Sequence, residues 1–183
     1  MSEKTELKEL LPELELIEDR GLRTKTLNVW AEALKEGGWK VGDLSKIPFT
    51  LLIETDVSLL EHTRAVTQTA IAIADTIEEF YEDSLPIDWD ALVAGALLHD
   101  VGKLLEYERK GKKVVKAEMG KDLRHPFSGM ALAFKRGIPS PICHMIAVHA
   151  KEGTGQRRST EAFIINHADF VNFEPLKHKA EQG

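Results

Sequence analysis

Several features that would assign a chain to a specialised class are missing from these 183 residues. Cys143 is the single cysteine, so an internal disulfide is excluded and thiolate chemistry has little to build on. No apolar stretch reaches the roughly 18 residues of a membrane span, and the charged start MSEKTELKEL lacks the apolar core of a signal peptide. The sequence therefore predicts a cytoplasmic protein that does not bind membranes.

An excess of positive charge is missing as well. The formal net charge is -6 at pH 7, which argues against binding to DNA or to an anionic membrane surface. With 43% hydrophobic and 30% charged residues, the composition is that of an ordinary globular protein. Because no repeat or domain boundary is evident, we expect a single domain over residues 1–183, with its oligomeric state left open.

The clearest helical pattern begins near residue 58. Apolar residues recur there at alternating steps of four and three, at Val66, Ala70, Ile73, Ile77 and Phe80. This spacing predicts an amphipathic helix over residues 58–80. Extending the pattern back by four residues reaches His62, which we therefore expect to face inward near one end of the helix.

Residues that typically begin or end helices predict the other helices. The N-terminal 50 residues are expected to form a helical extension, with helices over 5–18, interrupted by Pro12, and over 24–35, stopped by Gly37 and Gly38. Asp88 suits the N-cap of a helix over 89–100 that Gly102 closes. Further helices are expected over 126–137, over 141–149, and from residue 160 to a stop at Pro175.

The insert at residues 104–124 breaks the helical period. Within LEYERKGKKVVKAEMG, a Lys-Gly-Lys turn separates EYER from VVKA, which predicts a short β-hairpin or an exposed flap. The predicted fold is therefore all-α, a single helical bundle with a short β-hairpin insert.

Six potential metal ligands fall at helix ends or inside apolar runs: His62, His99, Asp100, His125, His149 and Asp169. Imidazole and carboxylate together suit divalent first-row metals. A carboxylate in apolar surroundings needs a partner, which a cation would supply. Taken singly, a histidine is more often a core or surface residue than a ligand. The coincidence of four histidines and two aspartates favours a metal site.

The segments EHTRAV, ALLHDVGK, HPFSGMALA, AVHAKEG and HADFV resemble the ordered signatures of the HD-domain superfamily of metal-dependent phosphohydrolases. The superfamily pattern of His, His-Asp and Asp falls on His62, His99, Asp100 and Asp169. His125 and His149 resemble the extended pattern of the dinuclear branch. The resemblance covers about residues 58–173.

The resemblance implies a helical HD domain with two divalent ions, iron or manganese first, with nickel, cobalt, zinc or magnesium as alternatives. One ion would be held by His62, His99, Asp100 and Asp169, and the other by His125 and His149, with Asp100 bridging. A hydroxide between the ions would hydrolyse a phosphate ester or anhydride. The expected substrate is a small phosphorylated molecule, a nucleotide or a related phosphodiester or monoester.

Lys103 resembles the lysine of the superfamily's HDxGK motif, which neutralises substrate phosphate, so Asp100 and Lys103 are the expected catalytic residues. A solvated lysine is the alternative for Lys103. Four further cations could line an anion-binding mouth, although a solvated surface is the simpler interpretation of each: Arg64, Lys151, Arg157 and Arg158. His144 is expected either in the core or next to the ligands, and His167 in a structural role.

Two alternatives to hydrolysis stay open. The same ligand set resembles that of the mixed-valent di-iron oxygenases of this superfamily, which cleave C–C or C–P bonds with dioxygen. A metal-holding regulatory module without turnover is the third possibility. No GYP triplet follows the His-Asp pair, which argues against the branch that degrades cyclic di-GMP.

Overall fold

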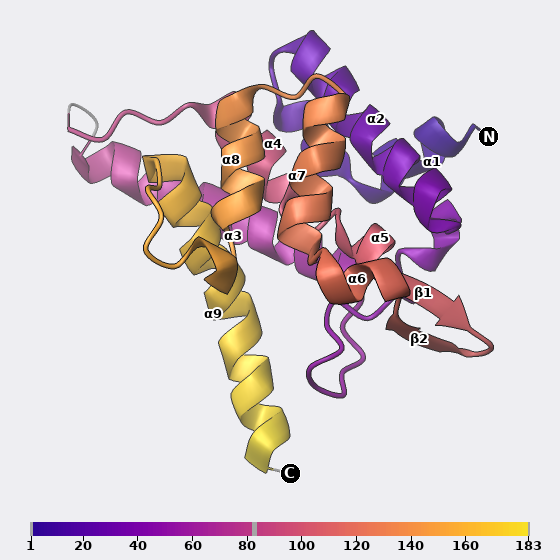
Figure 1. Ribbon diagram of the computed structural model, residues 1–183. Coiled ribbons are helices and arrows are strands. Elements are labelled where there is room, and N and C mark those ends of the chain that lie inside the picture. The colour runs from indigo at the N-terminus through magenta and orange to yellow at the C-terminus, as the bar shows by residue number, and fades with distance from the viewer. Residues whose placement is uncertain (1, 82–83, 183) are drawn as a thin grey trace.

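The computed structural model describes residues 2–81 and 84–182; residues 1 and 183, the limits of the expected domain, lie outside this part. Its elements are, in chain order, α1 (Glu3–Leu10), η1 (Pro12–Leu16), α2 (Arg20–Gly37), η2 (Val41–Asp43), α3 (Leu59–Tyr81), α4 (Trp89–Leu98), α5 (Lys103–Glu106), β1 (Tyr107–Lys110), β2 (Lys113–Lys116), α6 (Glu118–Asp122), α7 (His125–Lys135), α8 (Ser140–Val148), η3 (Lys151–Gly153) and α9 (Thr160–Gln182). The all-α prediction is confirmed (Figure 1). None of these helices is long and apolar enough to cross a membrane.

Helix α4 is the centre of the fold. It contacts α2, α3, α8 and α9, and its residues 91–98 are all buried. A helix that is apolar on every side is expected in such a place, because no face of it meets water. The predicted N-cap is confirmed, since the Asp88 carboxylate accepts a hydrogen bond from the backbone N–H of Ala91.

The end of α4 differs from the prediction. The helix stops at Leu98, so His99 and Asp100 lie in a turn instead of the last helical turn. Gly102 does not close α4 in a left-handed conformation, because its φ is -63°. It allows a close approach to α7 instead: a Cβ at Gly102 would lie 2.1 Å from the carbonyl oxygen of His125.

Helix α3 agrees with the predicted span of 58–80. Val66 and Ala70 are buried, and Ile73 and Ile77 pack partly against the core. Phe80 was expected on the same buried face but is 68% exposed, because the last turn of α3 runs past the core. His62, in the first turn, is buried as predicted.

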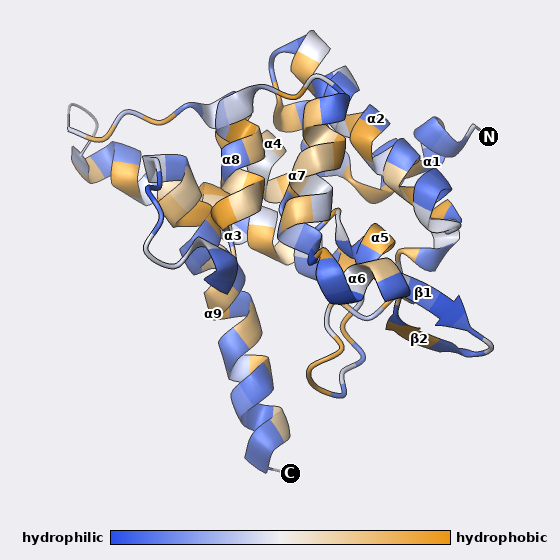
Figure 2. Ribbon diagram, viewed as in Figure 1, coloured by the Kyte–Doolittle hydropathy of each residue, from blue (hydrophilic) through white to orange (hydrophobic). Residues whose placement is uncertain are grey.

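Helix α9 does not end at Pro175, as the sequence predicted, but continues to Gln182. A proline inside a helix removes the hydrogen bond to the carbonyl four residues earlier, here that of Val171. Val171 is 56% exposed, so water can satisfy this carbonyl. The last turns project away from the bundle (Figure 1), and Figure 2 shows that they are mostly hydrophilic.

The N-terminal helices pack on the same core. Pro12 separates α1 from η1 as predicted, and α2 ends at a left-handed Gly38 with φ 71°. Trp30 of α2 is fully buried, and its indole N–H donates to the carbonyl oxygen of Leu97 at 3.2 Å.

The predicted hairpin is confirmed within the insert. Strands β1 and β2 pair antiparallel, with Tyr107 opposite Lys116, and Gly111 takes a positive φ of 63° in the turn. The hairpin projects from the bundle beside α6 (Figure 1), and β1 is hydrophilic (Figure 2).

Candidate metal centre

The six predicted ligands come from five separate places in the chain and meet at one end of α4. His62 lies in the first turn of α3, and the pair His99 and Asp100 directly follows α4. His125 begins α7, and His149 directly follows α8. Asp169 lies within α9. Ends of α3, α4, α7 and α8 therefore converge beside the interior of α9.

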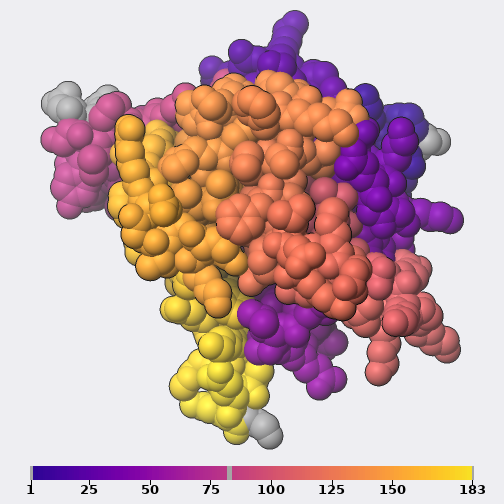
Figure 3. Space-filling view, viewed as in Figure 1, coloured from indigo at the N-terminus to yellow at the C-terminus, as the bar shows by residue number. Residues whose placement is uncertain are grey.

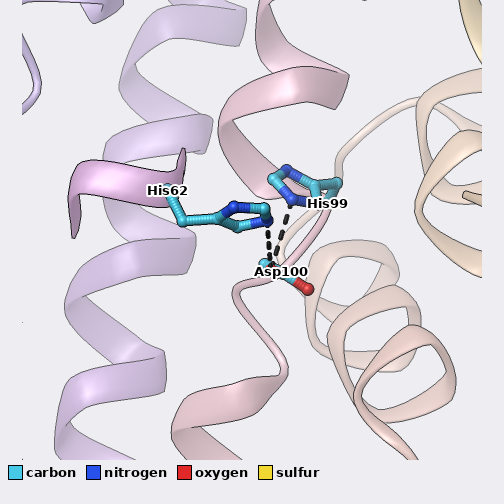
Figure 4. A group of neighbouring side chains, drawn as sticks. All are labelled: His62, His99 and Asp100. Carbon is cyan, nitrogen blue, oxygen red and sulfur yellow. Dashed lines mark ion pairs between the residues drawn. The ribbon is translucent and has the colours of Figure 1, made fainter. Parts of the chain in front are cut away.

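Asp100 lies between two pairs of histidines. Its Oδ2 is 3.3 Å from Nε2 of His99 and 3.4 Å from Nε2 of His62. Its Oδ1 is 3.3 Å from Nε2 of His125 and 3.6 Å from Nε2 of His149. Figure 4 shows the rings of His62 and His99 turned toward the carboxylate. Each pair, together with Asp100, forms a group compact enough to hold a metal ion.

Asp169 joins the first of these groups. Its Oδ1 lies 3.1 Å from Nε2 of His62, and Asp169 lines the same pocket as Asp100. The side chain of Asp169 is 16% exposed, whereas that of Asp100 is 1% exposed. Asp169 is therefore the more accessible of the two carboxylates.

The hydrogen bonds of His99 and His149 fit a bound cation. The Nδ1 of each ring lies 2.7 Å from a carbonyl oxygen three residues earlier, that of Ala96 or Ile146. A carbonyl only accepts, so Nδ1 carries the proton and Nε2 presents a lone pair. Both Nε2 atoms are buried and have no hydrogen-bond partner. A lone pair that faces a carboxylate oxygen needs a cation or a proton between them.

Burial and neighbouring charges shift the pKa values of the side chains at the centre. Burial raises the pKa of Asp100, but Lys103 and His99 outweigh it and hold this pKa well below its usual range. Burial lowers the pKa of His62, against the opposing effect of Asp169, and lowers that of His125 to about 4. Both rings are therefore neutral near pH 7, which is the form that binds metals.

The pKa of His99 shifts in the opposite direction. Burial lowers its pKa, but the charge and hydrogen bond of Asp100, together with the charge of Asp169, outweigh the burial, and the pKa is raised. A position that attracts a proton in this way also attracts a metal cation. The electrostatics and the geometry therefore both favour a bound cation beside His99 and Asp100.

Lys103 is buried instead of solvated. Its Nζ lies 2.5 Å from Oδ2 of Asp100 and 5.6 Å from the centre of the Phe49 ring. The side chain is 9% exposed and lines the pocket over the centre. Lys103 therefore neutralises the carboxylate and at the same time lies within the pocket.

Glu106 is a buried carboxylate that the sequence patterns did not reveal. Its Oε2 accepts hydrogen bonds from the backbone N–H of His125 at 2.7 Å and from Nδ1 of the same residue at 2.6 Å. Burial raises the pKa of Glu106, but its contacts with His125 outweigh the burial and lower this pKa to about 2. Glu106 ends the short helix α5, in a stretch of sequence that shows no apolar helical spacing and no recognised motif.

An open pocket of about 380 Å³ leads to the centre. His62, Asp100, His125 and Asp169 are among its lining residues. Aromatic rings contribute to its walls, from Phe49, Tyr107, Phe170 and Phe173. In Figure 3 the yellow part of α9 and the purple loop that follows residue 49 project from the same end of the molecule, and residues of both segments line the pocket.

Of the four cations considered for an anion-binding mouth, one lines the pocket, although a solvated surface was the simpler interpretation of each. Lys151 lines the pocket, but Arg64 pairs with Glu13 at 3.0 Å, and Arg158 donates to the carbonyl of Val148. Arg157 is not among the lining residues. Three lining cations were missed because nothing in their local sequence marks them: Lys116, Arg124 and Lys177.

The other histidines lie away from the centre. His144 was expected in the core or next to the ligands but is exposed, and its Nε2 lies 2.7 Å from the carbonyl oxygen of Arg157. The five-residue offset from the buried His149 turns its side chain outward. His167 is also exposed, on the outer face of α9.

Comparisons with known proteins agree with this geometry. The HD domain family matches residues 59–172 of the chain. A curated protein of Methanocaldococcus jannaschii, named dihydroneopterin 2',3'-cyclic phosphate phosphodiesterase, is 35% identical over 112 residues. That match covers 61% of this chain but 44% of the relative, so the chain spans less than half of the relative's length. No solved structure gives a significant match.

Proposed function

This chain belongs to the HD domain family, and from that premise we propose that it is a metal-dependent phosphohydrolase acting on a small phosphate ester or anhydride. The observation that carries the proposal is Asp100, whose two carboxylate oxygens each face a separate pair of histidines beneath an open pocket. The name of the curated relative supports a phosphodiester as the substrate. A nucleotide or a related compound is the proposed substrate class.

The proposed cofactor is a pair of divalent ions. His62, His99, Asp100 and Asp169 would hold the first ion, and His125 and His149 would hold the second, with Asp100 shared. Nitrogen and oxygen donors without thiolate suit divalent first-row metals, and the resemblance to the HD-domain superfamily favours iron or manganese among them. Such ions lower the pKa of water and stabilise negative charge on the attacking and leaving oxygens of a phosphoryl group.

The remaining residues of the pocket would bind and orient the substrate. Lys103 is the proposed catalytic cation, since its ammonium group lies within the pocket beside Asp100. Lys151, Lys116 and Arg124 add positive charge along the walls, which suits a phosphorylated substrate. The aromatic walls offer surfaces on which a planar ring can stack.

Metal analysis and activity assays together test the proposal. The protein, purified without added metal, would be analysed for iron, manganese, nickel, cobalt and zinc. It would then be assayed on cyclic phosphodiesters, linear phosphodiesters and phosphomonoesters, with and without a chelator, in the absence of oxygen. Anaerobic hydrolysis that a chelator abolishes and added metal restores is the expected result. A folded protein with no bound metal would contradict the proposal.

The same assays separate hydrolysis from the oxygenase alternative. A mixed-valent di-iron EPR signal without hydrolysis of any ester would favour oxygen chemistry. The variant Asp100→Ala, measured in parallel, is expected to lose both ions and all activity, because it removes the ligand shared by the two groups. Full activity with an unchanged metal content would exclude a shared role for Asp100.

A further inference from the structure

The four histidines of the centre are not oriented in the same way. His99 and His149 follow helix ends, so each ring can donate its Nδ1 proton to a carbonyl three residues earlier, in the last turn of its own helix. His125 begins α7, and no turn of that helix precedes it. It therefore needs an acceptor from elsewhere, and Glu106 supplies one at 2.6 Å.

Glu106 also satisfies the start of α7. The first backbone N–H groups of a helix have no partner within the helix. The Oε2 atom of Glu106 accepts from the backbone N–H of His125 at 2.7 Å, in addition to its contact with Nδ1. One carboxylate oxygen thus fixes both the backbone and the ring of the same residue. Negative charge at a helix N-terminus is stabilising as well.

The insert is built around this carboxylate. Glu106 is the last residue of α5, and its carbonyl accepts from the backbone N–H of Ala117 at 2.8 Å after the hairpin has turned back. Its Oε1 lies 3.2 Å from both Nζ of Lys116 and Nε of Arg124. These two cations pair with the second carboxylate oxygen, while the first is occupied by His125.

A glycine makes room for Glu106 in α6. A Cβ at Gly120 would lie 2.3 Å from the carbonyl oxygen of Glu106 and 2.9 Å from its Cγ. Residues from β2, α6 and the segment before α7 therefore all contact this one side chain or its backbone. The chain leaves the bundle at Glu106 and returns to it at His125, 19 residues later.

We propose that Glu106 is a positioning residue for His125, one of the proposed ligands of the second ion. Residues 104–124 would serve to hold the Glu106 carboxylate against His125. The inference rests on the proposed two-ion centre. Because the carboxylate accepts from Nδ1, the lone pair of His125 stands on Nε2, which lies 3.3 Å from Oδ1 of Asp100. Loss of such a carboxylate partner typically weakens metal binding about 10- to 100-fold.

The decisive measurement is the affinity of each ion in Glu106→Gln. Glutamine keeps the shape of the side chain but removes its charge. The matched control is Glu108→Gln, which makes the same change at an exposed position of β1. The metal-free proteins would be titrated with Mn²⁺ in a calorimeter. Glu106→Gln is expected to bind the second ion about 10- to 100-fold more weakly than wild type does. The first ion, and both ions of Glu108→Gln, are expected to be unchanged.

The wild-type protein gives a second readout that does not depend on the folding of any variant. In the metal-free protein near pH 7, ¹⁵N NMR is expected to find the proton of His125 on Nδ1. A proton on Nε2 alone would overturn the inference, as would two ions bound equally well by wild type and Glu106→Gln. Wild type that binds no ion would instead overturn the proposed function, and the inference with it.

Discussion

Lys103 places its ammonium nitrogen 2.5 Å from Oδ2 of Asp100, three residues earlier in the chain. Both side chains are buried, and this oxygen is the one that also faces His62 and His99. Removing one partner of a buried ion pair leaves an uncompensated charge in a medium that solvates it poorly. Lys103 is therefore the counter-ion that Asp100 has within the protein itself.

The variant Lys103→Met should separate this role from metal binding. The metal-free variant is expected to lose about 3–5 kcal/mol of unfolding free energy, since Asp100 stays buried without its partner. The metal-loaded variant should lose less, because the cations compensate Asp100. Urea denaturation with and without a chelator measures both values. Equal stability of metal-free Lys103→Met and wild type would exclude the counter-ion role.

Substitution of two histidines in or directly after α8 tests which residues bind each of the two proposed ions. His149 is buried, with its Nε2 3.6 Å from Oδ1 of Asp100, whereas His144 is exposed. His149→Ala is expected to retain the first ion and lose the second, with a large fall in kcat. His144→Ala, the control, should keep both ions. Elemental analysis gives the ions per chain, and loss of both ions in His149→Ala would contradict separate groups.

Local patterns predicted the helices well but not how far each one runs. The apolar period of α3 and the N-cap Asp88 of α4 are properties of short segments, and both predictions are confirmed. Pro175 was expected to end α9, but the exposed last turns tolerate the missing hydrogen bond. Gly102 is needed for the close contact with α7, and a local sequence pattern cannot predict a contact with a distant helix.

In the candidate centre, too, local patterns predicted some residues, whereas contacts between distant segments decide the role of others. The six proposed ligands could be named from the sequence because each stands in a recognisable motif at a helix end or in an apolar run. The fold brings these side chains close together, five of them around Asp100 and His62 and the sixth, Asp169, beside His62. Glu106 could not be found, because its role depends on the return of the chain to His125 after an irregular insert. The cations Lys116 and Arg124 were missed for the same reason.

The contribution of Glu106 to stability should depend on pH. Its pKa in the folded protein is about 2, below the ordinary value of 4.5, so the unfolded chain binds the proton first. The stabilisation is therefore complete above pH 4.5 and is lost as the pH falls toward 2. Urea denaturation of metal-free wild type and Glu106→Gln between pH 6 and pH 3 is expected to give a stability difference that shrinks with falling pH. A constant difference would show that the ionised carboxylate is not its source.

The close approach between Gly102 and α7 gives a test of packing beneath the centre. In Gly102→Ala the new Cβ would meet the carbonyl oxygen of His125 at 2.1 Å and the backbone nitrogen of Gly129 at 2.6 Å. Backbone atoms cannot rotate away, so α7 has to shift, at a cost of about 1–3 kcal/mol or more.

Gly42→Ala is the matched control, because a Cβ at Gly42 would meet nothing within 4 Å. Its stability is expected to stay within about 0.5 kcal/mol of wild type. Thermal unfolding compares the two variants, and Mn²⁺ titration should show that only Gly102→Ala weakens the second ion, since the shift of α7 moves His125. If both variants unfolded at the same temperature and bound both ions normally, His125 would not depend on this contact for its position.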